Sequence, residues 1–196
     1  MVGSRKIDKD TINAGKKLRL IQCLRTSPEN VDVGAAKAAG IPVATLRLMH
    51  YPAVAEHTVL LMLALAKHLL FAHRSVVAGH NPKNLEPLLT SATKIAYNWL
   101  EVKGITYLHG KTIGIIGLGE IGKEVVKRLR AFETKILYYK RHRLTEREEK
   151  SFGANYANLD ELLTKSDFVS LHVPHTSETE KMIGERELAL MKHTAF

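Results

Sequence analysis

Three glycines, Gly117, Gly119 and Gly122, have a spacing that suits the binding of a dinucleotide. They lie between the apolar run 112–116 and a stretch whose apolar residues recur at helical spacing. In such a turn the first glycine permits a sharp bend, the second lets the backbone approach a pyrophosphate, and the third lets helix and strand pack closely. The helix N-terminus then offers free N–H groups to the phosphates. A purely structural glycine turn is the alternative. The expected cofactor-binding residues of this segment are Gly117, Leu118, Gly119, Glu120, Ile121 and Gly122.

Basic residues stand where the ribose of such a cofactor is expected. About 20 residues after the glycines, NAD-binding units have an Asp or Glu that binds the ribose 2′-hydroxyl. Here the expected strand 135–139 is followed by Lys140, Arg141, His142 and Arg143. Lys140 and Arg141 suit a 2′-phosphate, so the sequence predicts NAD or NADP as the cofactor, with NADP favoured. The alternative is a solvated basic turn with no role in binding.

The composition is that of a soluble globular chain, with 196 residues, 45% of them hydrophobic and 25% charged. The one cysteine, Cys23, excludes an internal disulfide and fits a reducing cytosol, so a cytoplasmic protein is expected. A formal charge of +9 could indicate nucleic-acid binding, but the basic residues are scattered and aromatic residues are not interleaved with them. We therefore expect no nucleic-acid partner, and a positive field that favours anionic cofactors and carboxylate substrates.

Membrane and metal binding are also not expected. The most apolar stretch, residues 58–66, is followed by Lys67 and His68 and is much shorter than the roughly 18 apolar residues of a membrane span. No pair of histidines has metal-ligand spacing together with a carboxylate partner.

Strand-like and helix-like segments alternate along the chain, most regularly after residue 111. The expected strands are 18–24, 41–45, 112–117, 135–139 and 168–173. The expected helices are 30–39, 52–77, 120–132, 145–151, 159–165 and 185–191, with 52–77 as one long helix. This alternation predicts βαβ units and a parallel sheet, an α/β fold. Residues 194–196 resemble the start of another strand, so we expect a fragment or a truncated member of something longer.

Several further motifs, in order, make the chain resemble the D-isomer-specific 2-hydroxyacid dehydrogenases, a group that includes phosphoglycerate dehydrogenase and glyoxylate/hydroxypyruvate reductases. The resemblance covers roughly residues 17–196. The matching segments are Gly-Ile-Pro-Val at 40–43, Ala-Val-Ala-Glu-His-Thr at 53–58, Leu-His-Gly-Lys-Thr at 108–112 before the glycine turn, Ser-Leu-His-Val-Pro-His-Thr at 170–176 and Glu-Leu-Ala-Leu-Met-Lys at 187–192.

The resemblance implies two domains. Residues 1–52 would be part of a flavodoxin-like substrate-binding (catalytic) domain, and residues 53–196 an NAD(P)-binding Rossmann domain that is incomplete at its C-terminus. Val173 and Pro174 would line the adenine side, and Thr26 would face the nicotinamide. Arg25, Thr26 and Ser27 are the expected substrate-binding residues, although Pro28 lacks the backbone N–H that relatives, with glycines in this loop, offer to the substrate carboxylate.

The activity implied is an NAD(P)-dependent oxidoreductase, which transfers a hydride between the nicotinamide and a 2-keto/2-hydroxy acid at a CH–OH group. The family's catalytic Arg, Glu and His correspond to positions beyond Phe196, so no catalytic residue is assigned here. The alternative is a catalytically silent NAD(P)-binding module. The family also forms homodimers through its nucleotide domain, to which the helix from Pro52 would contribute.

Overall fold

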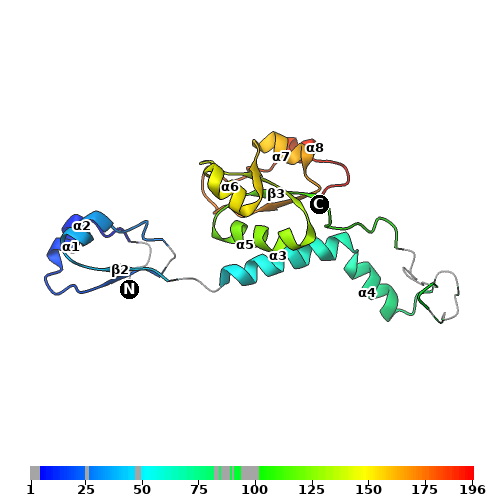
Figure 1. The fold of residues 1–196 in the computed structure, drawn as a ribbon, viewed down its shortest axis with the longest axis horizontal. Helices are drawn as coiled ribbons and strands as arrows, with labels where there is room; N and C mark the ends of the chain where they lie inside the picture. Colours follow the sequence, from blue (N-terminus) through cyan, green and yellow to red (C-terminus); the bar gives the residue numbers. More distant parts are fainter. Residues whose placement is uncertain are drawn as a thin grey trace. The chain divides into compact units, whose positions relative to one another are not determined.

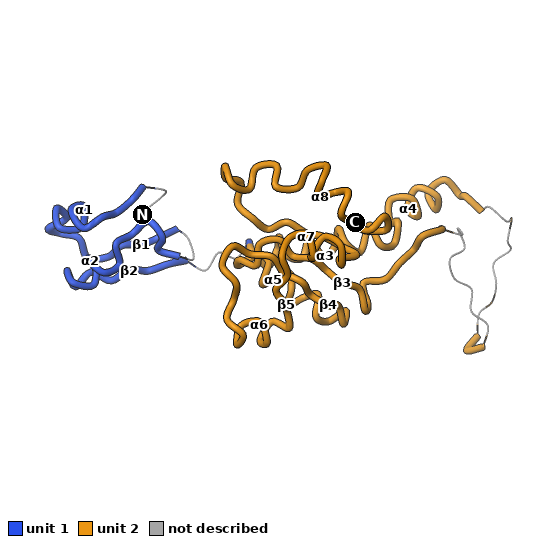
Figure 2. Tube along the Cα trace, turned by 90° about the horizontal axis from the view of Figure 1, so that it is seen from above, with its two compact units in different colours: residues 1–50 blue, residues 51–196 orange. Residues whose placement is uncertain are grey.

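The computed structural model describes residues 5–24, 27–46, 50–81, 84, 89, 91–93 and 102–196. The chain divides into two compact units, Met1–His50 and Tyr51–Phe196, which Figure 2 draws in blue and orange. The first unit carries the segment expected to bind substrate, and the second carries the glycine turn. That the first unit is part of a substrate-binding domain stays a prediction.

The first unit is built around one parallel strand pair. Its elements are α1 (Lys9–Ala14), β1 (Ile21–Gln22), α2 (Val33–Ala38) and β2 (Val43–Ala44). The prediction of a buried strand over 18–24 is wrong in extent, because β1 has two residues and Leu18, Leu20 and Leu24 are 37%, 49% and 41% exposed. Side chains alternate along extended backbone, so Ile21 and Cys23 face the core while the even-numbered residues face outward.

The second unit contains a four-stranded parallel sheet, which confirms the predicted α/β fold class. Its strands are β3 (Thr112–Ile116), β4 (Lys135–Tyr139), β5 (Ala154–Tyr156) and β6 (Phe168–Leu171), in the order β5-β4-β3-β6. Strand β5 was not predicted, because its Ala154 and Asn155 have low strand propensity. Beyond β6, Phe196 continues the pairing: its N–H donates to Asp167 (3.0 Å) and its carbonyl accepts from Val169 (2.9 Å).

Helices cover both faces of this sheet. The helices of the second unit are α3 (His50–Ala66), α4 (Leu69–Val77), α5 (Glu120–Leu129) with a 3₁₀ turn at Arg130–Phe132, α6 (Glu146–Phe152), α7 (Leu159–Lys165) and α8 (Glu185–Leu190). Of these, α4 extends away from the sheet (Figure 1). Ile113 and Ile115 of β3 share a core with α3 and α5, whereas Ile116 packs with α7 on the other face. Figure 1 shows α3 and α5 on one side of β3, and α7 and α8 on the other.

The prediction of one long helix over 52–77 is wrong, because α3 and α4 are separate and bent by 64°. His68 at the break has a positive φ of 49°. The chain returns here: Thr106 N–H donates to Ala66 O (2.9 Å), and Lys67 Nζ donates to Thr106 O (2.8 Å). The first bond satisfies the carbonyl of Ala66, which in a continuous helix would accept from a helix N–H, and the second fixes the returning segment beside the break. No single helix in the described ranges is long and apolar enough to cross a membrane, and the α3–α4 pair reaches that length only with this bend.

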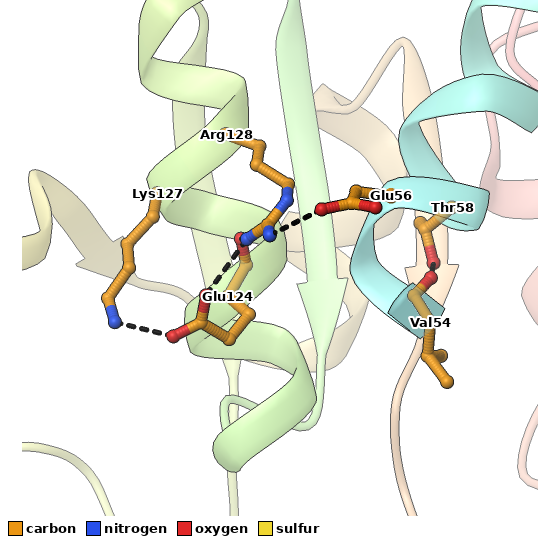
Figure 3. A network of polar contacts seen from close by, with 6 residues as sticks. All are labelled: Val54, Glu56, Thr58, Glu124, Lys127 and Arg128. Carbon is orange, nitrogen blue, oxygen red and sulfur yellow. Dashed lines mark hydrogen bonds and ion pairs between the residues drawn. The ribbon is translucent and has the colours of Figure 1, made fainter. Parts of the chain in front are cut away.

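An ionic network ties α5 to α3 (Figure 3). Arg128 donates to Glu56 of α3 (2.9 Å) and to Glu124 of its own helix (2.8 Å), and Lys127 also donates to Glu124 (2.6 Å). Hydrogen bonds from Lys127 and Arg128 hold the pKa of Glu124 below its usual value. The helix that begins at the glycine turn is therefore fixed both by its apolar face and by charge.

A second polar network fixes the loop after β4. The buried Tyr138 hydroxyl donates to Glu149 Oε1 (2.7 Å) and accepts from Leu144 N–H (2.9 Å), while Arg143 donates to both Glu149 oxygens (2.8 and 2.9 Å). Burial raises the pKa of Tyr138 to about 12. The bonds from Arg143 and then Tyr138 lower the pKa of Glu149 to about 2. The basic segment between β4 and α6 is thereby held at both ends.

Because the pKa of Glu149 is depressed from 4.5 to about 2, its contribution to stability is present above pH 4.5 and is lost as the pH falls towards 2. We expect Glu149→Gln to reduce the free energy of unfolding at pH 7 by about 1 kcal/mol, a modest value since Arg143 is solvent-exposed. Urea unfolding at pH 7, 4.5 and 3 measures this. The difference between wild type and variant should narrow as the pH falls to 3, and a constant difference across the series would contradict the assignment.

Candidate functional site

A cavity of about 430 Å³ opens at the carboxyl ends of β3, β4 and β6. After β3 the chain adds β4 and β5 on one side and then returns to add β6 on the other. In parallel α/β sheets, ligands bind at such a reversal, outside the carboxyl ends of the strands. The lining residues come from the end of β4 and from the three loops that follow these strands: Gly117, Leu118, Gly119, Tyr139, Lys140, Arg141, His172, Val173, Pro174, Thr176, Glu178, Thr179 and Met182.

Gly117 makes the sharp turn at the end of β3. Its φ is +95°, and a Cβ there would lie 2.6 Å from the carbonyl oxygen of His172. The backbone at the ends of β4 and β6 holds this turn from both sides: Gly117 N–H donates to Tyr139 O (2.9 Å), and His172 N–H donates to Ile116 O (2.7 Å). Only glycine combines this dihedral angle with this close approach.

The other two glycines have separate roles. A Cβ on Gly122 would lie 2.4 Å from Gly117 O, so this position must be glycine for α5 to reach β3. A Cβ on Gly119 would have no atom within 4 Å. Gly119 is the residue before α5, and no side chain caps the helix there. The N–H groups of the first turn therefore make no hydrogen bond to a capping side chain. Open space beside an uncapped helix N-terminus fits the pyrophosphate of a dinucleotide.

Two cations of the basic loop line the cavity, and they differ in their partners. Arg141 forms an ion pair with Glu178, which lines the cavity from the loop after β6. Lys140 is half-buried and makes no hydrogen bond or ion pair with any residue that the structure describes. Arg143 instead donates to Glu149 and is not among the lining residues. Of the basic loop, Lys140 is thus the cation left for an anionic ligand.

The loop after β6 forms the remaining wall. Val173 and Pro174 give it an apolar surface beside His172, whose Nε2 lies 3.0 Å from Ser170 Oγ. Burial lowers the pKa of His172, so the imidazole is neutral at pH 7. Thr179 orders the loop, because its hydroxyl donates to Pro174 O (2.5 Å) and accepts from the backbone N–H of Thr176 (2.9 Å).

The structure brings together part of the predicted site. Gly117, Leu118, Gly119, Lys140, Arg141, Val173 and Pro174 all line the cavity. Glu120, Ile121 and Gly122 belong to the first turn of α5 and are not lining residues. Ser27 lies in the first unit, and Arg25 and Thr26 lie outside the described residues.

Several lining residues were missed from the sequence, among them Tyr139, Glu178, Thr179 and Met182. The carboxyl-end rule for parallel strands could have found Tyr139, which ends β4. The sequence held no comparable signal for Glu178, which lies seven residues beyond Leu171 at the end of β6. In the described ranges, no three His, Cys, Asp or Glu residues are grouped as metal ligands.

A glycine turn between a central parallel strand and a helix, beside a cavity at the reversal of strand order, defines a dinucleotide-binding Rossmann unit. The family model for the D-isomer specific 2-hydroxyacid dehydrogenase, NAD binding domain, matches residues 59–196. The chain belongs to the D-isomer specific 2-hydroxyacid dehydrogenase family, as the sequence motifs predicted.

Similar proteins agree with this membership. A glyoxylate reductase from Thermococcus litoralis is 38% identical over 191 residues, which are 97% of this chain and 54% of the relative. The PH0520 protein from Pyrococcus horikoshii OT3 has a TM-score of 0.65 and 33% identity, over 98% of this chain and 54% of that one. D-lactate dehydrogenase from Aquifex aeolicus, solved with NAD and lactic acid, has a TM-score of 0.59 and 31% identity, over 95% and 51%. The chain spans about half the length of the curated relatives it matches.

The three glycines should separate folding from binding. We expect Gly117→Ala and Gly122→Ala to lower the free energy of unfolding by about 1–3 kcal/mol, because each new Cβ meets a backbone oxygen. Gly119→Ala should leave the melting temperature unchanged, because its Cβ meets no atom. It should weaken dinucleotide binding about ten-fold, because the methyl group keeps the pyrophosphate from the backbone N–H and one hydrogen bond to a charged group is lost. Thermal melting and cofactor titration measure the two effects. A Gly119→Ala protein that binds as well as wild type would rule out a close approach of the pyrophosphate at this turn.

Proposed function

We propose that this chain binds a nicotinamide dinucleotide in the cavity at the ends of β3, β4 and β6, as the cofactor-binding part of a D-2-hydroxyacid dehydrogenase. The observation that carries the proposal is the convergence of the glycine turn, the basic loop and the apolar loop on one cavity. When bound, the cofactor supplies hydride transfer to or from a small 2-keto/2-hydroxy acid. The names of the similar proteins, glyoxylate reductase and D-lactate dehydrogenase, support this substrate class.

Each part of the cavity has a role in this proposal. Gly119 and the first turn of α5 hold the pyrophosphate with backbone N–H groups. Lys140 and Arg141 face the 2′ position of the ribose, and Val173 and Pro174 cover the adenine through apolar contact. Neutral His172 fills the floor between the loops without adding charge.

The preferred cofactor in this proposal is NADP. A carboxylate at the end of β4 would accept a hydrogen bond from the 2′-hydroxyl of NAD, and this chain has Lys140 at that position. A lysine ammonium binds a phosphate as a point charge. Lys140 is half-buried at the cavity wall and unpaired among the described residues, which leaves its charge available to the 2′-phosphate.

We expect wild type to bind NADPH more tightly than NADH, and Lys140→Asp to weaken NADPH binding about ten-fold or more while it spares or improves NADH binding. Nicotinamide fluorescence in a titration of the purified chain measures both affinities. Lys135→Asp makes the same charge change at the other end of β4 and is the control. Equal loss in the two lysine variants would mean that general charge, and not a 2′-phosphate contact, drives binding.

The same samples test the reaction. Addition of glyoxylate or hydroxypyruvate to the NADPH complex, followed by absorbance at the nicotinamide band, detects turnover. Turnover supports a dehydrogenase active in this chain. Binding without turnover supports the alternative of an NAD(P)-binding module whose acid–base residues are supplied elsewhere.

We also infer that a second copy of the chain is a partner. Large apolar side chains are exposed along the two helices that precede the glycine turn: Val54, Leu60, Leu61, Leu65, Leu69, Leu70, Phe71, Val76 and Val77. Contiguous exposed apolar surface is typical of protein–protein interfaces. The opposite face of α3 packs on the core of the sheet, so α3, with the exposed apolar side chains of α4 beyond it, would hold the partner.

Sedimentation velocity tests the dimer. Leu61→Lys with Leu65→Lys should shift a dimeric wild type to monomer, because both side chains are about half exposed on α3 and would be desolvated in the interface. Leu188→Lys on α8, also exposed, should leave the dimer intact. A wild-type chain that is monomeric at high micromolar concentration would refute the inference.

A further inference from the structure

The ion pair between Arg141 and Glu178 spans the cavity mouth. Arg141 belongs to the loop after β4 and Glu178 to the loop after β6, and both line the cavity. The carboxylate therefore lies beside a cation that the sequence predicts to bind a 2′-phosphate. Their side chains are 66% and 63% exposed, so the pair is reachable by a ligand and its opening is not costly.

The backbone holds Glu178 at this place. The turn that carries it is closed by hydrogen bonds from Thr179 Oγ1 to Pro174 O (2.5 Å) and from the N–H of Glu180 to Thr176 O (2.8 Å). Pro174 and Thr176 are themselves lining residues. Glu178 is thus presented to the cavity by the same ordered turn that forms its apolar wall.

We propose that Glu178 is a specificity-determining residue, which neutralises Arg141 and weakens binding of the 2′-phosphorylated dinucleotide relative to the unphosphorylated one. This inference rests on the proposed function, and it assigns the role to a residue outside the glycine turn and the basic loop. A phosphate monoester at this position carries roughly two negative charges at pH 7. To reach Arg141 it must displace the carboxylate or bind beside it, whereas a ribose 2′-hydroxyl has no such charge to repel.

Glu178 also supplies the carboxylate that β4 lacks. NAD-binding units place an acidic side chain where it accepts a hydrogen bond from the ribose hydroxyl. Here the end of β4 has Lys140 and Arg141, and the nearest carboxylate of the cavity wall is on the opposite loop. Glu178 therefore keeps the cavity open to the unphosphorylated cofactor while Lys140 attracts the phosphorylated one.

The test is the ratio of the NADH and NADPH dissociation constants for wild type, Glu178→Gln and Glu180→Gln. Glu178→Gln should raise the preference for NADPH by at least about five-fold, the effect of one unit charge about 4 Å from a single phosphate charge in a water-exposed site. The effect should shrink in high salt, where the Debye length falls to about 3 Å at 1 M. Glu180→Gln removes a charge two residues away, outside the cavity lining, and should leave the ratio unchanged.

A double variant keeps the test independent of folding. Arg141→Gln alone leaves Glu178 without its partner and should weaken NADPH binding. Adding Glu178→Gln should restore NADPH affinity to within about two-fold of wild type, because the neutral pair again has no net charge. If the double variant binds NADPH no better than Arg141→Gln, or if Glu178→Gln leaves the ratio unchanged, the inference is overturned. Failure of wild type to bind either cofactor would instead overturn the proposed function.

Discussion

The contact between Gly122 and the carbonyl oxygen of Gly117 is the constraint on which the site depends. Any side chain at position 122 would push α5 away from the end of β3, since even a Cβ would lie 2.4 Å from that oxygen. The helix N-terminus is brought to the cavity only because this approach is permitted. Core packing and the Arg128 bridge to Glu56 then hold the helix in place along its length. The backbone N–H groups at the start of α5 are therefore placed at the cavity by packing contacts several residues further along the helix.

The positive charge that the cavity offers to a ligand depends on which cations are already in ion pairs, as well as on which residue types are present. The loop after β4 has three permanent cations, yet Arg143 donates to Glu149 and Arg141 is paired with Glu178. The Tyr138–Glu149 bond anchors the loop so that Lys140 stays at the cavity wall. The formal charge of +9 on the chain does not reveal this arrangement. Within this loop, Lys140 is the cation left to attract an anionic ligand.

The sequence predicted the elements whose signal is local. Residues 135–139 form the expected strand, which contains β-branched and aromatic side chains. Residues 159–165 form the expected helix, which a capping residue precedes. Glu133, which follows the 3₁₀ turn, has a left-handed φ of 53°, a conformation that favours glycine. The break between α3 and α4 could not be predicted, since it depends on Thr106 and Gly104, far along the chain, meeting Ala66 and His68. The pairing of Arg141 with Glu178 was missed for the same reason: it requires two loops that only the sheet order brings together.

The position of α3 in the chain has a consequence for synthesis. Its buried residues Ala55, Val59, Met62 and Ala66 pack on elements that begin only at β3. A ribosome adds about 5–20 residues per second, so this apolar face leaves the exit tunnel seconds before its partners exist. During that interval both faces of the helix are bare, and the nascent chain offers a surface that chaperones recognise. The order of elements along the gene thus makes α3 the segment most exposed to misassociation before β3 and α5 emerge.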